Sequence, residues 1–233
     1  MILRKLADAI KRQDWFVVFI ELLIVVFGVY IGIYLGDIQT ARQHAIETDR
    51  ALAVLESELR SDLARLDEVI ALQTRRVNEQ QDLIHLWSDE DLDGPEVTRV
   101  LSLIIGDNST FFPNKSAYET MQAGGFLASL TDEPLRLHIA RLFEREYNRQ
   151  DFNGVYYDEL MFDFSNLILS SHWDRVNSRF LGDPAYARAV LRNGMITVRE
   201  QGQFYFRFVT EQIRPDIVTA LEMIDAYQEG NAR

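Results

Sequence analysis

Histidine and carboxylate side chains are the groups in this chain that could bind a metal or transfer protons. The four histidines are His44, His85, His138 and His172. A di-iron site in a helical bundle requires two Glu-x-x-His pairs on inward faces, whereas the nearest arrangement here is one pair, Asp82 and His85. The chain contains no cysteine, which excludes thiolate nucleophiles, disulfides and cysteine-ligated metals. We therefore predict no metal site and no cofactor.

A second group of reactive types lies in the run Ser170-Ser171-His172-Trp173-Asp174. A nucleophilic triad needs these side chains to converge from separate parts of the fold, and sequence neighbours rarely do so. Ser171 or Asp174 is better explained as a residue at the end of a helix. The chain also lacks a phosphate-binding loop and a dinucleotide glycine pattern. We expect no catalytic activity.

A polar segment with an aromatic pair, between residues 107 and 125, is the best candidate for a ligand or partner surface. Asn114, Lys115 and Tyr118 are its polar groups, and Lys115 is the only lysine beyond the first eleven residues. The alternative is structural, because asparagine and serine also end and begin backbone elements. In that interpretation Phe111 and Phe112 fill the interior.

The same segment carries signals for a short helix. Ser116 and Glu119 have the spacing of a capping box, in which each side chain accepts a hydrogen bond from the backbone N–H of the other residue. Gly124 and Gly125 follow eight residues later and could end the helix. We predict a short helix between these two signals.

The elements that must position these groups begin with an apolar stretch. Residues 15–35 read WFVVFIELLIVVFGVYIGIYL and include one charge, and a helix of this length spans roughly 30 Å of hydrocarbon. A buried soluble helix would show a polar face. A cleaved signal peptide would have a shorter apolar region followed by a small-x-small site, and the nearest such site is at residues 51–53. We predict an uncleaved transmembrane helix over residues 15–36.

The distribution of charge predicts the orientation of this helix. Four cationic residues precede it, Arg4, Lys5, Lys11 and Arg12, so residues 1–14 are expected to form a cytoplasmic basic tail. Residues 37–233 would then form an extracytoplasmic, periplasmic domain at the bacterial inner membrane. The formal net charge is −12, so the main domain would repel phosphate and nucleic acid is not expected as a partner.

Glycine spacing predicts that the apolar helix packs against another helix. Gly28, Gly32 and Gly36 follow one another at intervals of four, which removes side chains from one face and lets a second backbone approach. Glu21 lies within roughly 20° of that face. A carboxylate within hydrocarbon costs at least about 2.5 kcal/mol, so Glu21 should face protein, or else reach the headgroups. The partner would be a second copy or another membrane protein.

A long bundle helix is expected to follow, because residues 40–87 contain neither proline nor glycine. Its apolar positions are spaced three or four apart, which is the period of a helical face; they are Leu52, Leu55, Leu59, Leu63, Leu66 and Ile70. They also repeat at intervals of eleven, which argues against a left-handed coiled coil. Its charged residues are interpreted as a solvated face, and they include Glu56, Glu58, Arg60, Asp62 and Arg65.

Further helices complete an all-α bundle. Asp93-Gly94-Pro95 predicts a short helix to about Ile105, and Asp132 with Pro134 predicts another helix start. The apolar residues 152–170 are expected to be core. Asp183 and Pro184 should begin a short helix, and residues 195–227 should form a long closing helix, in which the alternating run 204–208 is helical rather than a strand.

Two segments resemble a known group of proteins. QDWFVVFIELLIVVFGVYIG followed by ALAVLESELRSDLARLDEVI, and later FFPNKSAYETMQAGGFLASLTDEPLR, resemble a widespread family of short bacterial single-pass membrane proteins that carry a domain of unknown function. In that family a Glu enters the span, glycines leave it and a long acidic helix follows. The resemblance implies this topology and no activity.

The leading hypothesis is a non-enzymatic interaction or scaffold protein, anchored in the lipid bilayer as an oligomer or as an accessory subunit of a membrane complex. Its anchor would associate through Glu21, Gly28, Gly32 and Gly36. The alternative is a ligand-sensing extracytoplasmic bundle, which would need a partner protein because the cytoplasmic part is about fourteen residues long.

Overall fold

The computed structural model describes residues 15–89, 93–106 and 110–231, and this part of the chain is almost entirely helical, as predicted. Its elements in chain order are α2 (Trp15–Leu86), α3 (Gly94–Gly106), α4 (Ser116–Ala123), α5 (Phe126–Ser129), α6 (Glu133–Arg141), η1 (Leu142–Glu146), α7 (Tyr147–Asp163), η2 (Phe164–Leu169), α8 (Ser170–His172), β1 (Trp173–Asp174), β2 (Arg179–Phe180), α9 (Pro184–Phe208), η3 (Val209–Ile213) and α10 (Arg214–Asn231), where η marks π-helical turns. The chain forms two compact units, residues 1–50 and 51–233.

The described part of the first unit is the beginning of α2. Side chains described between residues 22 and 43 are all exposed. Among the described residues, α2 is the one helix long and apolar enough to cross a membrane; its most apolar window has mean hydropathy 1.9 and no buried residue. The predicted basic tail, residues 1–14, lies outside the described residues.

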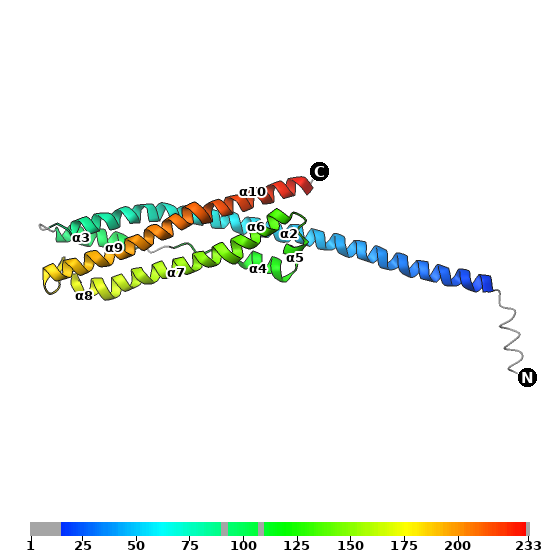
Figure 1. Ribbon diagram of the computed structural model, residues 1–233, viewed down its shortest axis with the longest axis horizontal. Coiled ribbons are helices and arrows are strands. Elements are labelled where there is room, and N and C mark those ends of the chain that lie inside the picture. The colour runs from blue at the N-terminus through cyan, green and yellow to red at the C-terminus, as the bar shows by residue number, and fades with distance from the viewer. Residues whose placement is uncertain (1–14, 90–92, 107–109, 232–233) are drawn as a thin grey trace, which may run out of the picture. The chain divides into compact units, whose positions relative to one another are not determined.

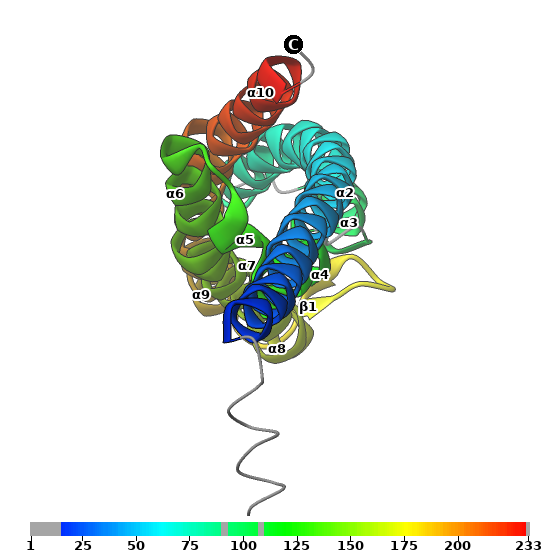
Figure 2. The ribbon, with the colours of Figure 1, turned by 90° about the vertical axis from the view of Figure 1, so that its right-hand side faces the viewer.

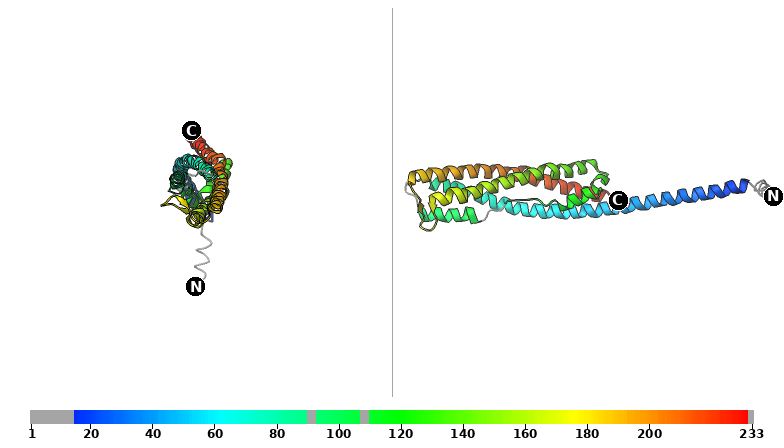
Figure 3. Two further views of the ribbon diagram at one scale, coloured as in Figure 1. Left: turned by 90° about the vertical axis from the view of Figure 1, so that its left-hand side faces the viewer. Right: turned by 90° about the horizontal axis from the view of Figure 1, so that it is seen from below.

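The second unit consists mainly of three helical rods that run side by side (Figures 1, 2 and 3). The first is α2 from residue 51 onward, the second runs without a break from α6 to α8, and the third runs from α9 to α10. The π turns η1, η2 and η3 lie within the second and third rods, and such turns insert an extra residue into a helix. The predicted start of the closing helix at residue 195 is therefore wrong, because one helix continues from residue 184 to residue 231.

Helix starts follow the predicted capping chemistry in two places. The Asp132 carboxylate accepts from the backbone N–H of Leu135 at 2.9 Å, and Asp183 accepts from that of Ala185 at 3.2 Å. Each is followed by proline in the first turn. An N-cap carboxylate satisfies an otherwise unpaired backbone donor, so these starts were readable from the sequence.

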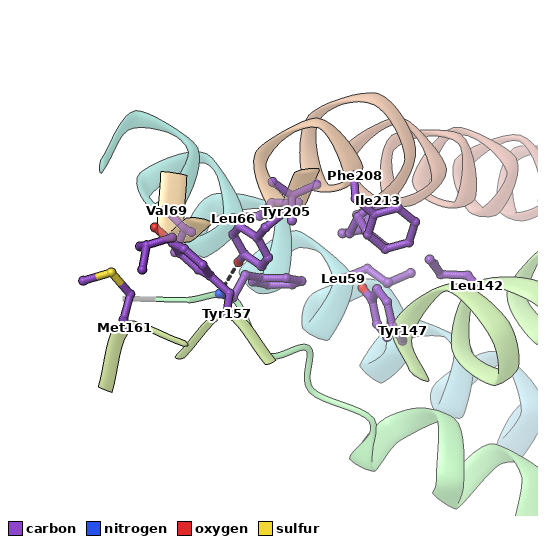
Figure 4. Packing of buried hydrophobic residues seen from close by; sticks show 14 of the residues in the cluster. Leu59, Leu66, Val69, Leu142, Tyr147, Tyr157, Met161, Tyr205, Phe208 and Ile213 are labelled. Atoms are coloured by element: carbon purple, nitrogen blue, oxygen red, sulfur yellow. Dashed lines mark hydrogen bonds between the residues drawn. The ribbon is translucent and has the colours of Figure 1, made fainter. Parts of the chain in front are cut away.

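The predicted apolar face of α2 forms its side of the core. Leu66 and its neighbour Val69 lie near Tyr157 of α7 and Tyr205 of α9, whereas Leu59 lies beside Tyr147 (Figure 4). The remaining predicted positions, buried or partly buried, are Leu52, Leu55, Leu63 and Ile70.

The prediction that residues 152–170 are core is wrong for the outward half of that helix. Phe152 is 71% exposed, Phe162 67% and Leu167 63%. The opposite side of the same helix is buried, including Tyr157 and Phe164. Both sides are apolar, so composition alone did not distinguish them.

A short hairpin separates the second and third rods. Trp173 pairs with Phe180 and Asp174 with Arg179. The Asp174 carboxylate accepts from the backbone N–H groups of Val176 and Asn177, each at 3.0 Å. Asp174 therefore organises this turn rather than the end of α8, which contains Ser171.

Candidate functional site

The three glycines of the apolar helix lie one turn apart along α2. Apart from the neighbouring backbone of α2 itself, a Cβ atom added at Gly28, Gly32 or Gly36 would have no atom within 4 Å. The backbone of Glu21 belongs to α2, but its side chain lies outside the described residues. The described structure thus gives an uncovered glycine face and leaves the predicted alignment of Glu21 with it as a prediction.

The second predicted surface lies in what we call the docked loop, residues 110–118. Glu58 of α2 holds its end, because one carboxylate oxygen accepts from Ser116 Oγ at 2.5 Å and the other accepts from the Ala117 N–H at 2.8 Å. Lys115 is the N-cap of α4 and makes no side-chain capping bond. The predicted capping box of Ser116 and Glu119 is therefore wrong. A carboxylate from a distant helix caps α4 instead.

One helical turn along α2, Asp62 holds the middle of the docked loop. Its Oδ2 accepts from the Asn114 N–H at 3.0 Å and from the Tyr147 hydroxyl at 3.3 Å, while Oδ1 accepts from Arg65 at 2.9 Å. Only 2% of Asp62 is exposed. Burial raises the pKa of Asp62 to about 6, against the lowering effect of these donors. The interpretation of Asp62 as part of a solvated face is wrong.

The predicted ligand residues all have protein partners. Asn114 Oδ1 accepts from the Ser116 N–H at 3.2 Å, and Lys115 forms an ion pair with Asp151. The Tyr118 hydroxyl donates to Glu144 Oε1 at 2.8 Å. Burial, and then the Glu144 carboxylate, raise the pKa of Tyr118. These contacts favour the structural interpretation of the loop.

Aromatic packing agrees with that interpretation in part. Tyr118 stacks on Phe143, with ring centroids 4.5 Å apart. Phe111 is fully buried, whereas Phe112 remains 40% exposed and does not fill the interior.

A buried set of polar side chains in the middle of the bundle was not predicted. We call it the polar layer, and it comprises Gln73, Arg76 and Gln80 of α2 and Gln150 and Asn153 of α7, none more than 6% exposed. On α2 these residues continue the three-four spacing of the leucines. That continuation is the signal that could have indicated burial, although a polar helix surface has the same spacing.

Tyrosines link the polar layer to the docked loop. Gln80 Nε2 donates to the Tyr157 hydroxyl at 3.3 Å, and Gln150 Nε2 donates to the Phe111 carbonyl at 3.0 Å. The Tyr205 hydroxyl accepts from the Phe111 N–H at 2.7 Å. Three buried atoms, one on each of Gln80 (Oε1), Gln150 (Oε1) and Asn153 (Nδ2), have no hydrogen-bond partner in the described structure. Buried polar atoms are nearly always satisfied, by water or by a ligand where protein does not reach them.

Histidines take structural places in the described chain. His138 Nε2 lies 2.9 Å from the Asp216 carbonyl, and His172 Nδ1 lies 2.8 Å from the Ile168 carbonyl. Within the described residues, no group of three or more His, Cys, Asp or Glu side chains is placed to hold a metal ion.

Comparison with known protein families gives a match to residues 21–175, which include most of α2, the docked loop and α7. The chain belongs to DUF6090, a family of unknown function. The DUF6090 match includes the later of the two segments that resemble the family, and all of the earlier segment except residues 13–20. It ends before α9. No curated protein and no solved structure matches the chain.

Proposed function

We propose that this DUF6090 protein is a single-pass, membrane-anchored interaction protein of the bacterial inner membrane, without catalytic activity of its own. Residues 15–36 would cross the bilayer, residues 1–14 would lie in the cytoplasm, and residues 37–233 would form a periplasmic domain. It would act as an oligomer or as an accessory subunit of a membrane complex.

The observation that carries this proposal is the uncovered apolar beginning of α2. No residue of its most apolar window is buried, whereas a core helix of a soluble protein buries such a surface against its own fold. Fifteen large apolar side chains described between residues 19 and 38 are exposed, and in water such a surface would be strongly unfavourable. A bilayer resolves this conflict, and the excess of Lys and Arg before the span supports the cytoplasmic N-terminus.

The glycine face supports association of the anchor. Open space at Gly28, Gly32 and Gly36 leaves room for a second backbone, and close helix contact is the usual role of such spacing in membranes. Glu21 on that face would then hydrogen-bond across the contact instead of facing lipid.

Native mass spectrometry and crosslinking of the full chain in mild detergent test this proposal. We expect an oligomer or a co-purifying membrane protein that is lost in Gly32→Leu, because leucine keeps the two backbones apart. Ile33→Leu places the same leucine side chain at the next residue, about 100° away from the glycine face, and should have no effect. A strict monomer without a partner, or association unchanged by Gly32→Leu, would overturn the proposal.

The polar layer favours a second candidate, a ligand-sensing bundle that signals through a partner protein. Buried atoms of Gln80, Gln150 and Asn153 have no protein partner, so a small polar molecule could satisfy them. A molecule that binds there would raise the melting temperature of the full chain in proportion to the logarithm of its concentration. Gln80→Leu with Gln150→Leu should abolish that increase, and an increase that survives both changes would argue against this candidate.

A further inference from the structure

The outward side of the second rod carries an unusual number of large apolar side chains. We call it the outer α7 face, and its apolar members are Phe152, Val155, Tyr156, Phe162 and Leu167, which are 44–71% exposed. Phe152 and Tyr156 stack on each other with ring centroids 6.4 Å apart. Exposed apolar residues are ordinary when scattered, but a contiguous set on one helix usually marks an interaction site.

Carboxylates lie among these apolar groups. Glu159 and Asp163 are exposed on the same face, between and beside the aromatic side chains. A hollow of about 720 Å³ lies next to them and is lined in part by Asp158, Glu159, Phe162 and Asp163, with Arg175 as its cationic residue. The face therefore combines apolar surface with an excess of negative charge.

We propose that the outer α7 face is the docking site for an amphipathic helix of another protein, one whose apolar stripe is flanked by Lys or Arg. The apolar stripe would cover Phe152, Tyr156 and Phe162, and the basic residues would meet Glu159 and Asp163. Helices commonly bind grooves in this way, through apolar side chains three and four residues apart. The proposal rests on the proposed function, since it specifies the partner of an interaction protein.

Charge favours this occupant over the two alternatives. If two copies met through this face in parallel, Glu159 and Asp163 of each would lie near those of the other, and like charges oppose binding. An anionic lipid surface would also be repelled by these carboxylates. A basic helix provides opposite charge and apolar surface together.

Photo-crosslinking in growing cells tests the docking site on the full chain. A benzophenone side chain replaces Phe152 in one variant and Phe162 in a second. The matched control carries it at Tyr186, an exposed aromatic residue of α9. Tandem mass spectrometry identifies the segment that is captured. We expect both outer-face positions, but not position 186, to capture a segment of another protein with apolar residues at helical spacing and an excess of Lys and Arg.

Neutral variants test the role of charge. Glu159→Gln with Asp163→Asn should lower the yield of that adduct about threefold to tenfold, since exposed ion pairs each contribute modestly. Capture of a second copy, of lipid or of an acidic segment would overturn the proposal, as would yields at positions 152 and 162 no higher than at position 186. Association of Gly32→Leu is measured in membranes prepared in parallel. Failure of anchor association is therefore seen separately from failure of the docking site.

Discussion

Replacing Asp62 by asparagine tests the claim that the docked loop is held by a buried carboxylate. The folded protein raises the pKa of Asp62 from 3.8 to about 6, mainly through burial. The folded state therefore binds this proton more tightly than the unfolded state does. The resulting stabilisation is fully present below pH 3.8 and is lost as the pH rises through about 6.

The expected size follows from the two pKa values. The difference between about 6 and 3.8 corresponds to about 3 kcal/mol of unfolding free energy, at roughly 1.4 kcal/mol per pH unit. Asparagine keeps the shape and one oxygen that can accept from the Asn114 N–H, but it does not titrate. At pH 4 the unfolded carboxyl is already partly ionised, so the unfolding free energy of the natural chain minus that of Asp62→Asn should fall by about 2–2.5 kcal/mol between pH 4 and pH 7, most of the full difference.

Denaturant unfolding of the full chain in mild detergent measures this difference. The fluorescence of Trp87 and Trp173, which are 0% and 2% exposed, reports loss of the core. Other carboxylates titrate in both proteins, so subtraction removes them. Glu68→Gln, at an exposed position of the same helix, controls for the change in net charge. A difference that stays flat, or that grows as the pH rises, would refute the assignment of Asp62 as a buried, desolvated carboxylate.

Two further predictions use the same unfolding measurement. Glu58→Ala removes both acceptors at the start of α4 and should lower the unfolding free energy by about 1–2 kcal/mol. Glu68→Ala, at an exposed position of α2, should change it little, and equal effects of the two changes would contradict the capping role of Glu58. Phe164→Ala should cost about 3–5 kcal/mol because Phe164 is 1% exposed, while Phe162→Ala should change stability by less than about 0.5 kcal/mol, and a large loss there would show that the outer α7 face is core.

Periodicity and capping chemistry were enough to predict most of the helices, but not the start of the closing helix or the group that caps α4. The leucine spacing of α2, and the aspartate-proline pairs at Asp132 and Asp183, depend on neighbouring residues along one chain segment. Which side of an apolar helix faces outward depends on what packs against it. Phe152 and Phe164 are both phenylalanines on the second rod. Phe164 is buried because α2 and α9 pack against its side of the rod, whereas Phe152 points away from them and is exposed.

The docked loop shows the same limit for polar groups. The sequence indicated that Asn114, Lys115 and Tyr118 belong to one functional or structural segment, and the structure places them together. Their partners could not be predicted, because Asp62 lies 52 residues before Asn114 and Asp151 lies 36 residues after Lys115. A charged residue on a helix has the same sequence signal whether it is exposed or buried by tertiary contacts. For this reason the helical pattern of α2 places Asp62 on the solvated face, although it is buried.

The DUF6090 match ends at residue 175, whereas the folded unit of this chain continues to residue 233. Tyr205 of α9 stacks on Tyr157 at 5.5 Å and accepts from the Phe111 N–H. Phe164 and Ile168 also lie against Gly194, close enough that an added Cβ there would meet them at 3.1–3.2 Å. The matched segment alone would expose these apolar side chains and leave the Phe111 N–H without its acceptor. In this chain the third rod, α9–α10, therefore completes the core that the matched segment begins, because it covers Tyr157 and Phe164 and supplies the acceptor for the Phe111 N–H.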